Sequence, residues 1–86
     1  MSSVYRDCSD LVLLSAVLAE RNRQRTIWSE QHDREHTGEG WVTVLSMLLG
    51  QVAAAEHGGG PKEMERRLVQ LAATALAALE WEAKRA

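Results

Sequence analysis

Apolar residues recur at helical spacing in three stretches of the chain, and no stretch alternates with a period of two. The most apolar stretch is WVTVLSMLLGQVAAAE, at residues 41–56. One face of a helix built from it would carry Trp41, Leu45, Leu48, Val52 and Ala55. Further apolar residues surround this helix and leave it almost no polar side. We therefore predict a central helix that is buried from several directions, by its own chain or by a second copy.

A first helix is predicted before it, over about residues 10–31, after a loose lead-in at residues 1–8. Ser9 or Asp10 can cap this helix, because both side chains accept hydrogen bonds from the unpaired amides of a first turn. The first half of the helix is apolar and its second half is charged. We expect burial of the apolar end, at Leu11, Leu14, Val17 and Leu18. We expect the opposite end to be solvated, with Arg21, Arg23 and Arg25 promoting solubility.

A third helix is predicted over about residues 61–84, beyond the break HGGGP. Glycine adopts left-handed and extended conformations at little steric cost, and proline suits the first position of a helix. The expected apolar stripe of this helix is Met64, Leu68, Leu71, Ala75 and Leu79. With the central helix at about residues 41–57, the predicted fold is a single all-α domain of three helices spanning residues 1–86.

The apolar content of the chain predicts self-association. Of its 86 residues, 45% are hydrophobic, yet a chain of this size buries only about 60% of its unfolded surface. A lone three-helix unit would leave apolar surface exposed, so we expect a homodimer or a larger oligomer. The expected oligomer interface comprises Trp41, Leu45, Leu48, Val52, Leu68, Leu71, Ala75 and Leu79.

Charge and cysteine content exclude several classes of protein. The net charge of −2 argues against a nucleic-acid or anionic-membrane binder, which would normally be basic. Cys8 is the only cysteine, so an internal disulfide and a cysteine-rich zinc site are excluded. The run LVLLSAVLA is too short to span a bilayer and lacks the basic flank of a signal peptide. We expect a cytoplasmic protein.

Three segments together resemble one family. ERNRQRTIWSEQHD resembles the end of the first helix of small MazG-like proteins, which are all-α nucleoside triphosphate pyrophosphohydrolases of phages and bacteria. WVTVLSMLLGQVAAA resembles their second helix, and ERRLVQLAATALAALEWE resembles the helix that follows. The resemblance covers roughly residues 11–82. It implies a three-helix MazG-like unit that forms a four-helix-type bundle with at least one further copy.

The acidic motifs of that family are missing here. In MazG-like enzymes, E-x-x-E on one helix and E-x-x-D on the next hold magnesium, which prefers carboxylate oxygens. The first pair of positions falls on Leu48 and Gln51, and the second pair falls on Arg67 and Gln70. Arginine has no lone pair to offer a metal, and residues 45–55 contain no Asp or Glu that a shifted alignment could use. The resemblance therefore implies a degenerate site without catalytic residues, metal or cofactor.

Two other constellations have ordinary explanations. His32 and His36 have the spacing of a helical zinc pair, but TGEG follows them directly and argues against a helix there. We expect a solvated loop over residues 32–40. Arg66 and Arg67 could clamp a phosphate, but Glu63 is an ion-pair partner for Arg67 at the i, i+4 spacing, and we expect that pair instead.

Three functional hypotheses follow. The first is a catalytically degenerate MazG-like protein, a pseudoenzyme that binds itself or another protein or serves as a structural oligomer. The second is an active Mg²⁺-dependent pyrophosphohydrolase with relocated acids such as Glu56, Glu63 or Glu65. The third is a nucleotide-binding regulator that uses Arg66 and Arg67. The empty ligand positions favour the first hypothesis.

Overall fold

The computed structural model describes residues 9–27 and 38–85, and this part of the chain contains three helices and no strand. They are α1 (Asp10–Ile27), α3 (Gly38–Gly58) and α4 (Gly60–Arg85). The predicted all-α, three-helix character is confirmed. The predicted lead-in, the end of the first helix and residues 32–37 of the predicted loop fall outside the described residues. The loop prediction is wrong at residues 38–40, which form the first turn of α3. In the part that is described, no helix is long and apolar enough to cross a membrane.

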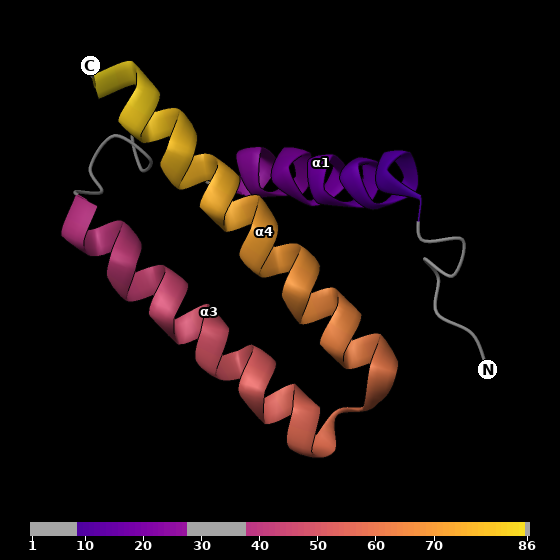
Figure 1. Cartoon of the computed structure of the whole chain (residues 1–86). Coiled ribbons are helices and arrows are strands. Elements are labelled where there is room, and N and C mark those ends of the chain that lie inside the picture. Colours follow the sequence, from indigo (N-terminus) through magenta and orange to yellow (C-terminus); the bar gives the residue numbers. More distant parts are fainter. Residues whose placement is uncertain (1–8, 28–37, 86) are drawn as a thin grey trace.

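The long helix α4 lies between the other two (Figure 1). Helix α3 runs antiparallel to α4 along most of its length, whereas α1 packs across the other side of α4 at a steep angle (Figure 1). Two different faces of α4 are therefore covered by two different neighbours. This arrangement determines which polar side chains of α4 meet α3 and which meet α1.

The core between α3 and α4 follows the predicted face of α3. Trp41, Leu48 and Ala55 are buried at intervals of seven residues, which places them on one side of the helix. Ala73 and Ala77 of α4 are buried as well. Their small side chains allow a neighbouring helix to approach α4 closely. The prediction for the buried face of α3 is confirmed.

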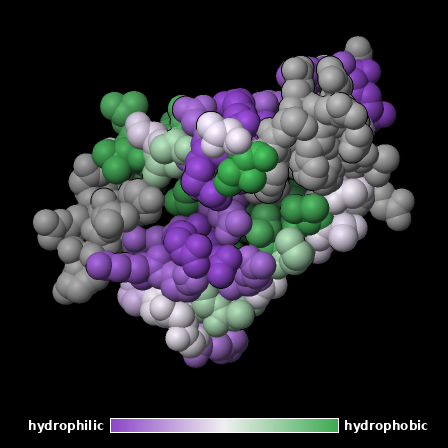
Figure 2. Space-filling view, turned by 180° about the vertical axis from the view of Figure 1, so that it is seen from behind, coloured by the Kyte–Doolittle hydropathy of each residue, from purple (hydrophilic) through white to green (hydrophobic). Residues whose placement is uncertain are grey.

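The prediction for α1 is wrong at its leucines, which are exposed, and at Arg21, which is buried, whereas Val17 is half-buried and Arg23 and Arg25 are exposed. The buried residues of α1 are Arg21 and Gln24. The three leucines at helical spacing in its first half are exposed instead, and Figure 2 shows hydrophobic side chains standing out over these first turns. They are Leu11, Leu14 and Leu18. The cause is the surface that α4 offers to α1, which carries Thr74 and Glu80 as hydrogen-bond partners.

The prediction for the apolar stripe of α4 is wrong at three positions. Leu68, Ala75 and Leu79 are exposed, whereas the buried residues of α4 are Ala73, Thr74 and Ala77. Because α4 packs against two helices, its buried positions are small residues of the alanine-rich segment. The larger leucines lie beside them.

Capping of α1 agrees with the sequence and is assigned to Ser9. The Ser9 hydroxyl accepts a hydrogen bond from the amide of Val12 at 3.2 Å, and its carbonyl accepts one from the amide of Leu13 at 3.0 Å. Both contacts satisfy amides that lack partners within the first turn of a helix.

The break between α3 and α4 provides a matched pair of glycine substitutions. Gly60 has a φ of 80°, in the left-handed region, so Gly60→Ala is expected to destabilise the protein by about 1–2 kcal/mol. Gly58 is helical and a Cβ added there meets nothing within 4 Å. Gly58→Ala should therefore be neutral or slightly stabilising. Urea unfolding of both variants checks this, and equal losses at the two positions would contradict the assigned turn.

Candidate functional site

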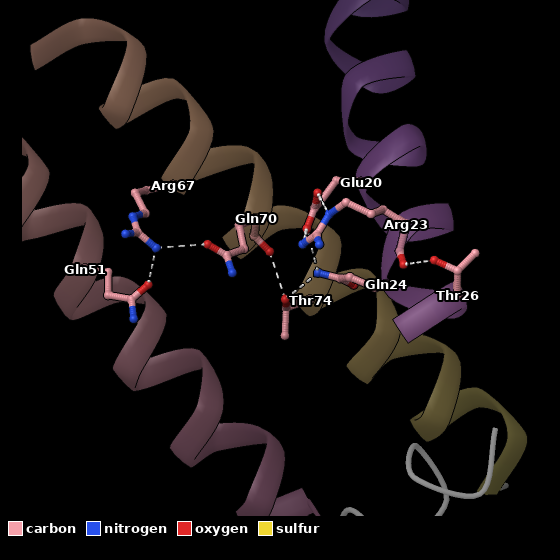
Figure 3. Close-up of polar contacts among 8 residues, drawn as sticks. All are labelled: Glu20, Arg23, Gln24, Thr26, Gln51, Arg67, Gln70 and Thr74. Carbon is pink, nitrogen blue, oxygen red and sulfur yellow. Dashed lines mark hydrogen bonds and ion pairs between the residues drawn. The ribbon is translucent and has the colours of Figure 1, made fainter. Parts of the chain in front are cut away.

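Gln51, Arg67 and Gln70, at positions where the resemblance to MazG-like enzymes would place carboxylates, lie together between α3 and α4 (Figure 3). Nη1 of Arg67 donates hydrogen bonds to Oε1 of Gln51 at 2.8 Å and to Oε1 of Gln70 at 3.4 Å. Nε of Arg67 donates to Oε2 of Glu63 at 3.3 Å, which is the ion pair predicted from the sequence. We call these four residues, Gln51, Glu63, Arg67 and Gln70, the arginine cluster.

The arginine cluster is built around the positively charged side chain of Arg67. The Arg67 guanidinium lies among oxygens from two amides and one carboxylate, and each of them accepts a hydrogen bond from it. Leu48, one helical turn before Gln51, is buried and presents only an alkyl chain. This residue set does not fit a magnesium ion, because arginine cannot ligate a metal and a neutral amide is a weaker ligand than a carboxylate.

A second group of polar contacts continues from the cluster to α1. The Thr74 hydroxyl donates to the main-chain carbonyl of Gln70 at 2.8 Å, and it accepts a hydrogen bond from Nε2 of Gln24 at 3.0 Å. Gln24 and Thr74 are 1% and 0% exposed. Polar contacts therefore cross the molecule from α3 through α4 to α1 (Figure 3). Buried hydrogen bonds of this kind fix the relative positions of the helices. Oε1 of Gln24 is buried without a hydrogen-bond partner among the described residues.

Arg21 and Arg25 bind α4 and are not simply solvated, which corrects the solubility role expected for them. Nη2 of Arg21 lies 3.2 Å from Oε2 of Glu80, and Nη2 of Arg25 lies 2.8 Å from Oε1 of the same carboxylate. Arg21 is 3% exposed. Burial acts to raise the pKa of Glu80, but the hydrogen bond from Arg21 and the charges of both arginines outweigh it, so the pKa lies below its ordinary value.

The two arginines considered for a phosphate clamp lie on different sides of α4. Arg67 contacts α3, whereas Arg66 lines a hollow of about 520 Å³ that is shared with Ala16, Ala19 and other residues of α1. Both guanidinium groups share the carboxylate of Glu63, with Nε of Arg66 at 3.0 Å from its Oε1. The hydrogen bond from Arg66 is the main cause that holds the pKa of Glu63 below its ordinary value.

The acidic residues considered as relocated metal ligands do not lie close together either. Glu56 is exposed on the last turn of α3, and Glu63 belongs to the arginine cluster. Glu65 lines the hollow beside α1, and its Oε2 is buried without a hydrogen-bond partner among the described residues. No group of three or more His, Cys, Asp or Glu side chains that could hold a metal occurs within residues 9–27 and 38–85.

The residues expected at an oligomer interface are distributed over three environments in the single chain. Trp41 and Leu48 are buried inside the protomer. The half-buried members are Leu45, Val52 and Leu71, and the exposed ones are Leu68, Ala75 and Leu79. The sequence analysis did not single out Val42, Met47 and Leu49, which are exposed large apolar residues of α3. The sequence indicated their exposure only through the lack of charged residues on this helix. That pattern shows that every side of the helix is apolar, but it does not show which side is exposed in the protomer.

Gln24 and Thr74 were also missed as members of the site. Their hydrogen bond joins residues 50 positions apart, so no local pattern in either helix indicates it. In comparisons with known proteins, no protein-family model, curated protein or solved structure matches this chain.

Proposed function

We propose that this chain is a catalytically degenerate MazG-like helical protein that acts by binding protein, and first of all by binding further copies of itself. The arginine cluster is the observation that supports this function best. The positions at which MazG-like enzymes carry metal-binding carboxylates hold a guanidinium that is hydrogen-bonded to Gln51, Gln70 and Glu63. A protein cation among these oxygens supports the helix interface without a bound metal.

Association is supported by the apolar surface that the protomer leaves exposed. Large apolar residues are exposed on each helix, including Leu14 of α1, Leu49 of α3 and Leu79 of α4. On α3, the exposed Val42 and Leu49 lie two turns apart on one side of the helix, and a contiguous exposed apolar patch on a small protein marks an interaction site. Protein binding is a function that needs no chemistry from the degenerate positions.

The two alternatives have less support from the geometry. Relocated acids would have to converge on one ion, whereas Glu63 is bound to Arg66 and Arg67 and Glu56 is exposed on another helix. A nucleotide clamp would need Arg66 and Arg67 to be available to phosphate, whereas both guanidinium groups already bind the carboxylate of Glu63 and Arg67 also donates to Gln51 of α3.

A turnover assay tests the proposed function. Pyrophosphate release is measured from a panel of nucleoside and deoxynucleoside triphosphates, with Mg²⁺ or Mn²⁺ and with EDTA as the control. We expect no metal-dependent release from protein that is folded by circular dichroism. Release that depends on the metal and disappears in EDTA would contradict the proposal, and loss of that release on Glu63→Gln or Glu65→Gln would identify the relocated acid.

A further inference from the structure

A hollow of about 520 Å³ lies between α1 and α4. Helix α1 contributes one of its faces to this hollow, with positions spaced i, i+3, i+4 and i+7. This face consists of Ala16, Ala19, Glu20 and Arg23. The two alanines are too small to fill the space between the helices. Ligand pockets commonly have volumes of about 300–1,000 Å³ and mostly apolar walls, so the hollow is of a suitable size for a small molecule.

Helix α4 contributes a face with the same spacing, which consists of Lys62, Glu65, Arg66 and Val69. Val69 adds to the apolar surface that the alanines of α1 provide. The other three side chains of this face are charged and carry both signs. We call the space between these two helix faces the α1–α4 hollow.

Two of the cations that line the α1–α4 hollow already have carboxylate partners. Nε and Nη2 of Arg23 donate to the two oxygens of Glu20 at 2.8 and 2.6 Å. Nε and Nη2 of Arg66 donate to the two oxygens of Glu63 at 3.0 and 2.6 Å. Pairs that form two hydrogen bonds of this kind are strong, so a ligand would gain little by competing for these arginines.

Lys62 and Glu65 are the charged groups of the hollow that are left for a ligand. The Lys62 side chain is exposed and makes no hydrogen bond or ion pair with any residue of the described ranges. Glu65 is half-buried, and its Oε2 is buried without a partner in the same part of the chain. The two residues are spaced i, i+3, in the order that is less favourable for pairing with one another. Because a buried carboxylate oxygen without a donor costs free energy, a donor that reached Glu65 would be stabilising.

We propose that the α1–α4 hollow binds a small zwitterion with an aliphatic body, of which an aliphatic α-amino acid is the simplest. Its ammonium group pairs with Glu65 and its carboxylate pairs with Lys62, while its aliphatic side chain covers Ala16, Ala19 and Val69. Lys62 lies in the first turn of α4, where the helix dipole also favours a negative charge. A ligand with a single charge would leave either Lys62 or Glu65 without a partner. This inference goes beyond the proposed function and does not depend on it.

Three small molecules with the same aliphatic body test the recognition of both charges. They are L-leucine, 4-methylpentanoate, which lacks the ammonium group, and 3-methylbutylamine, which lacks the carboxylate. The Kd of each is measured from the shifts of the amide signals of the wild-type protein in NMR titrations. Each single-charge analogue loses one charge-assisted hydrogen bond, so we expect it to bind at least about tenfold more weakly than leucine.

Two substitutions assign the two charges to their partners. Lys62→Met should weaken the binding of leucine and of 4-methylpentanoate at least about tenfold and leave the Kd of 3-methylbutylamine unchanged. Glu65→Gln should weaken leucine and 3-methylbutylamine and leave 4-methylpentanoate unchanged. Lys84→Met and Glu56→Gln change exposed residues that do not line the hollow. These two controls should bind all three molecules as wild type does.

A third substitution fills the α1–α4 hollow without changing a charge. Ala19 is exposed on α1 and lines the hollow, so Ala19→Leu places an alkyl chain in the space of the ligand and keeps good helix propensity. We expect it to weaken all three molecules. Ala83→Leu, at an exposed position near the end of α4, is the control and should bind as wild type does.

Three results would overturn the inference. The first is leucine that produces no saturable shifts at the residues lining the hollow. The second is leucine that binds but is unaffected by Lys62→Met and Glu65→Gln, which would place it elsewhere. The third is a single-charge analogue that binds as tightly as leucine, which would contradict the recognition of a zwitterion. None of these results changes the expected outcome of the pyrophosphate-release assay, so the proposed function is tested separately.

Discussion

Replacing Glu80 with leucine is expected to lower the free energy of unfolding by about 3 kcal/mol, because it removes the carboxylate that binds a buried guanidinium. Arg21 is 3% exposed, and its Nε and Nη2 donate to the two oxygens of Glu80. Arg25 loses the same partner. Glu80→Leu therefore weakens the contact between α1 and α4 and should reduce the denaturant midpoint.

Glu82→Leu is the matched control, since Glu82 lies two residues away on α4 and also binds an arginine. The side chains of Glu82 and Arg85 are 54% and 59% exposed, compared with 28% for Glu80. Exposed ion pairs contribute about 0–1 kcal/mol, so this substitution should have little effect. Similar losses for Glu80→Leu and Glu82→Leu would contradict the role of Arg21 as a buried anchor of α1.

The same ion pairs determine how stability responds to acid. The pKa of Glu80 is lower in the folded chain than its ordinary value. The pKa of Glu20 is also lowered, chiefly by the hydrogen bond from Arg23. A carboxylate with a lowered pKa stabilises the fold at pH values above its unfolded pKa, and this contribution is lost as the pH falls through the folded pKa. The loss of stability on acidification should be smaller in Glu80→Leu than in wild type.

Placing carboxylates at the four positions where the MazG resemblance would have them is expected to make folding depend on magnesium. The variant combines Leu48→Glu, Gln51→Glu, Arg67→Glu and Gln70→Asp. It replaces the Arg67 guanidinium with negative charge beside Glu63 and puts a carboxylate at buried Leu48. Without metal we expect a loss of at least about 3 kcal/mol, because charges that are buried without partners are strongly unfavourable. Mg²⁺ binds clustered carboxylates and should recover much of this loss.

A neutral variant controls for the disturbed packing. Leu48→Gln combined with Arg67→Gln leaves amides at all four positions and removes the guanidinium without adding a carboxylate. It should be less stable than wild type and show no response to Mg²⁺. Unfolding of both variants is followed by circular dichroism with Mg²⁺ and with EDTA. If the carboxylate variant ignores Mg²⁺, the four positions do not converge as the MazG resemblance implies.

Features set by local sequence were predicted well. The glycines before Pro61 predicted the break between the last two helices, and Gly60 adopts the left-handed conformation there. The face of α3 with Trp41 and Leu48 is buried as its periodicity indicated. The ion pair between Glu63 and Arg67 needed only the i, i+4 spacing on one helix. Each of these features depends on residues within a few positions of one another.

Features set by the neighbouring helix could not be predicted. Periodicity shows which residues of α1 share a face, but the choice of buried face depends on what α4 presents. The hydrogen bond from Gln24 to Thr74 spans 50 positions, and that from Arg21 to Glu80 spans 59. These contacts bury the polar side of α1 and leave its leucines exposed in the protomer. The arginine cluster was predicted only as an absence of carboxylates, and its hydrogen bonds are a finding of the structure.

The positive charge of Arg67 connects the fold to the proposed function. A metal-dependent enzyme would gain stability from its ion, whereas Arg67 already supplies a cation to Gln51, Gln70 and Glu63. The interface between α3 and α4 can then persist without metal.

The most direct test of this account is the thermal unfolding of the wild-type protein with Mg²⁺ and with EDTA. A ligand that binds the folded state raises the Tm, and one that does not bind leaves it unchanged. Because Arg67 already supplies a cation to the oxygens of Gln51, Gln70 and Glu63, we predict the same Tm in both conditions. A Tm that rises with Mg²⁺ concentration and falls back in EDTA would show a metal site in the folded chain and contradict the account.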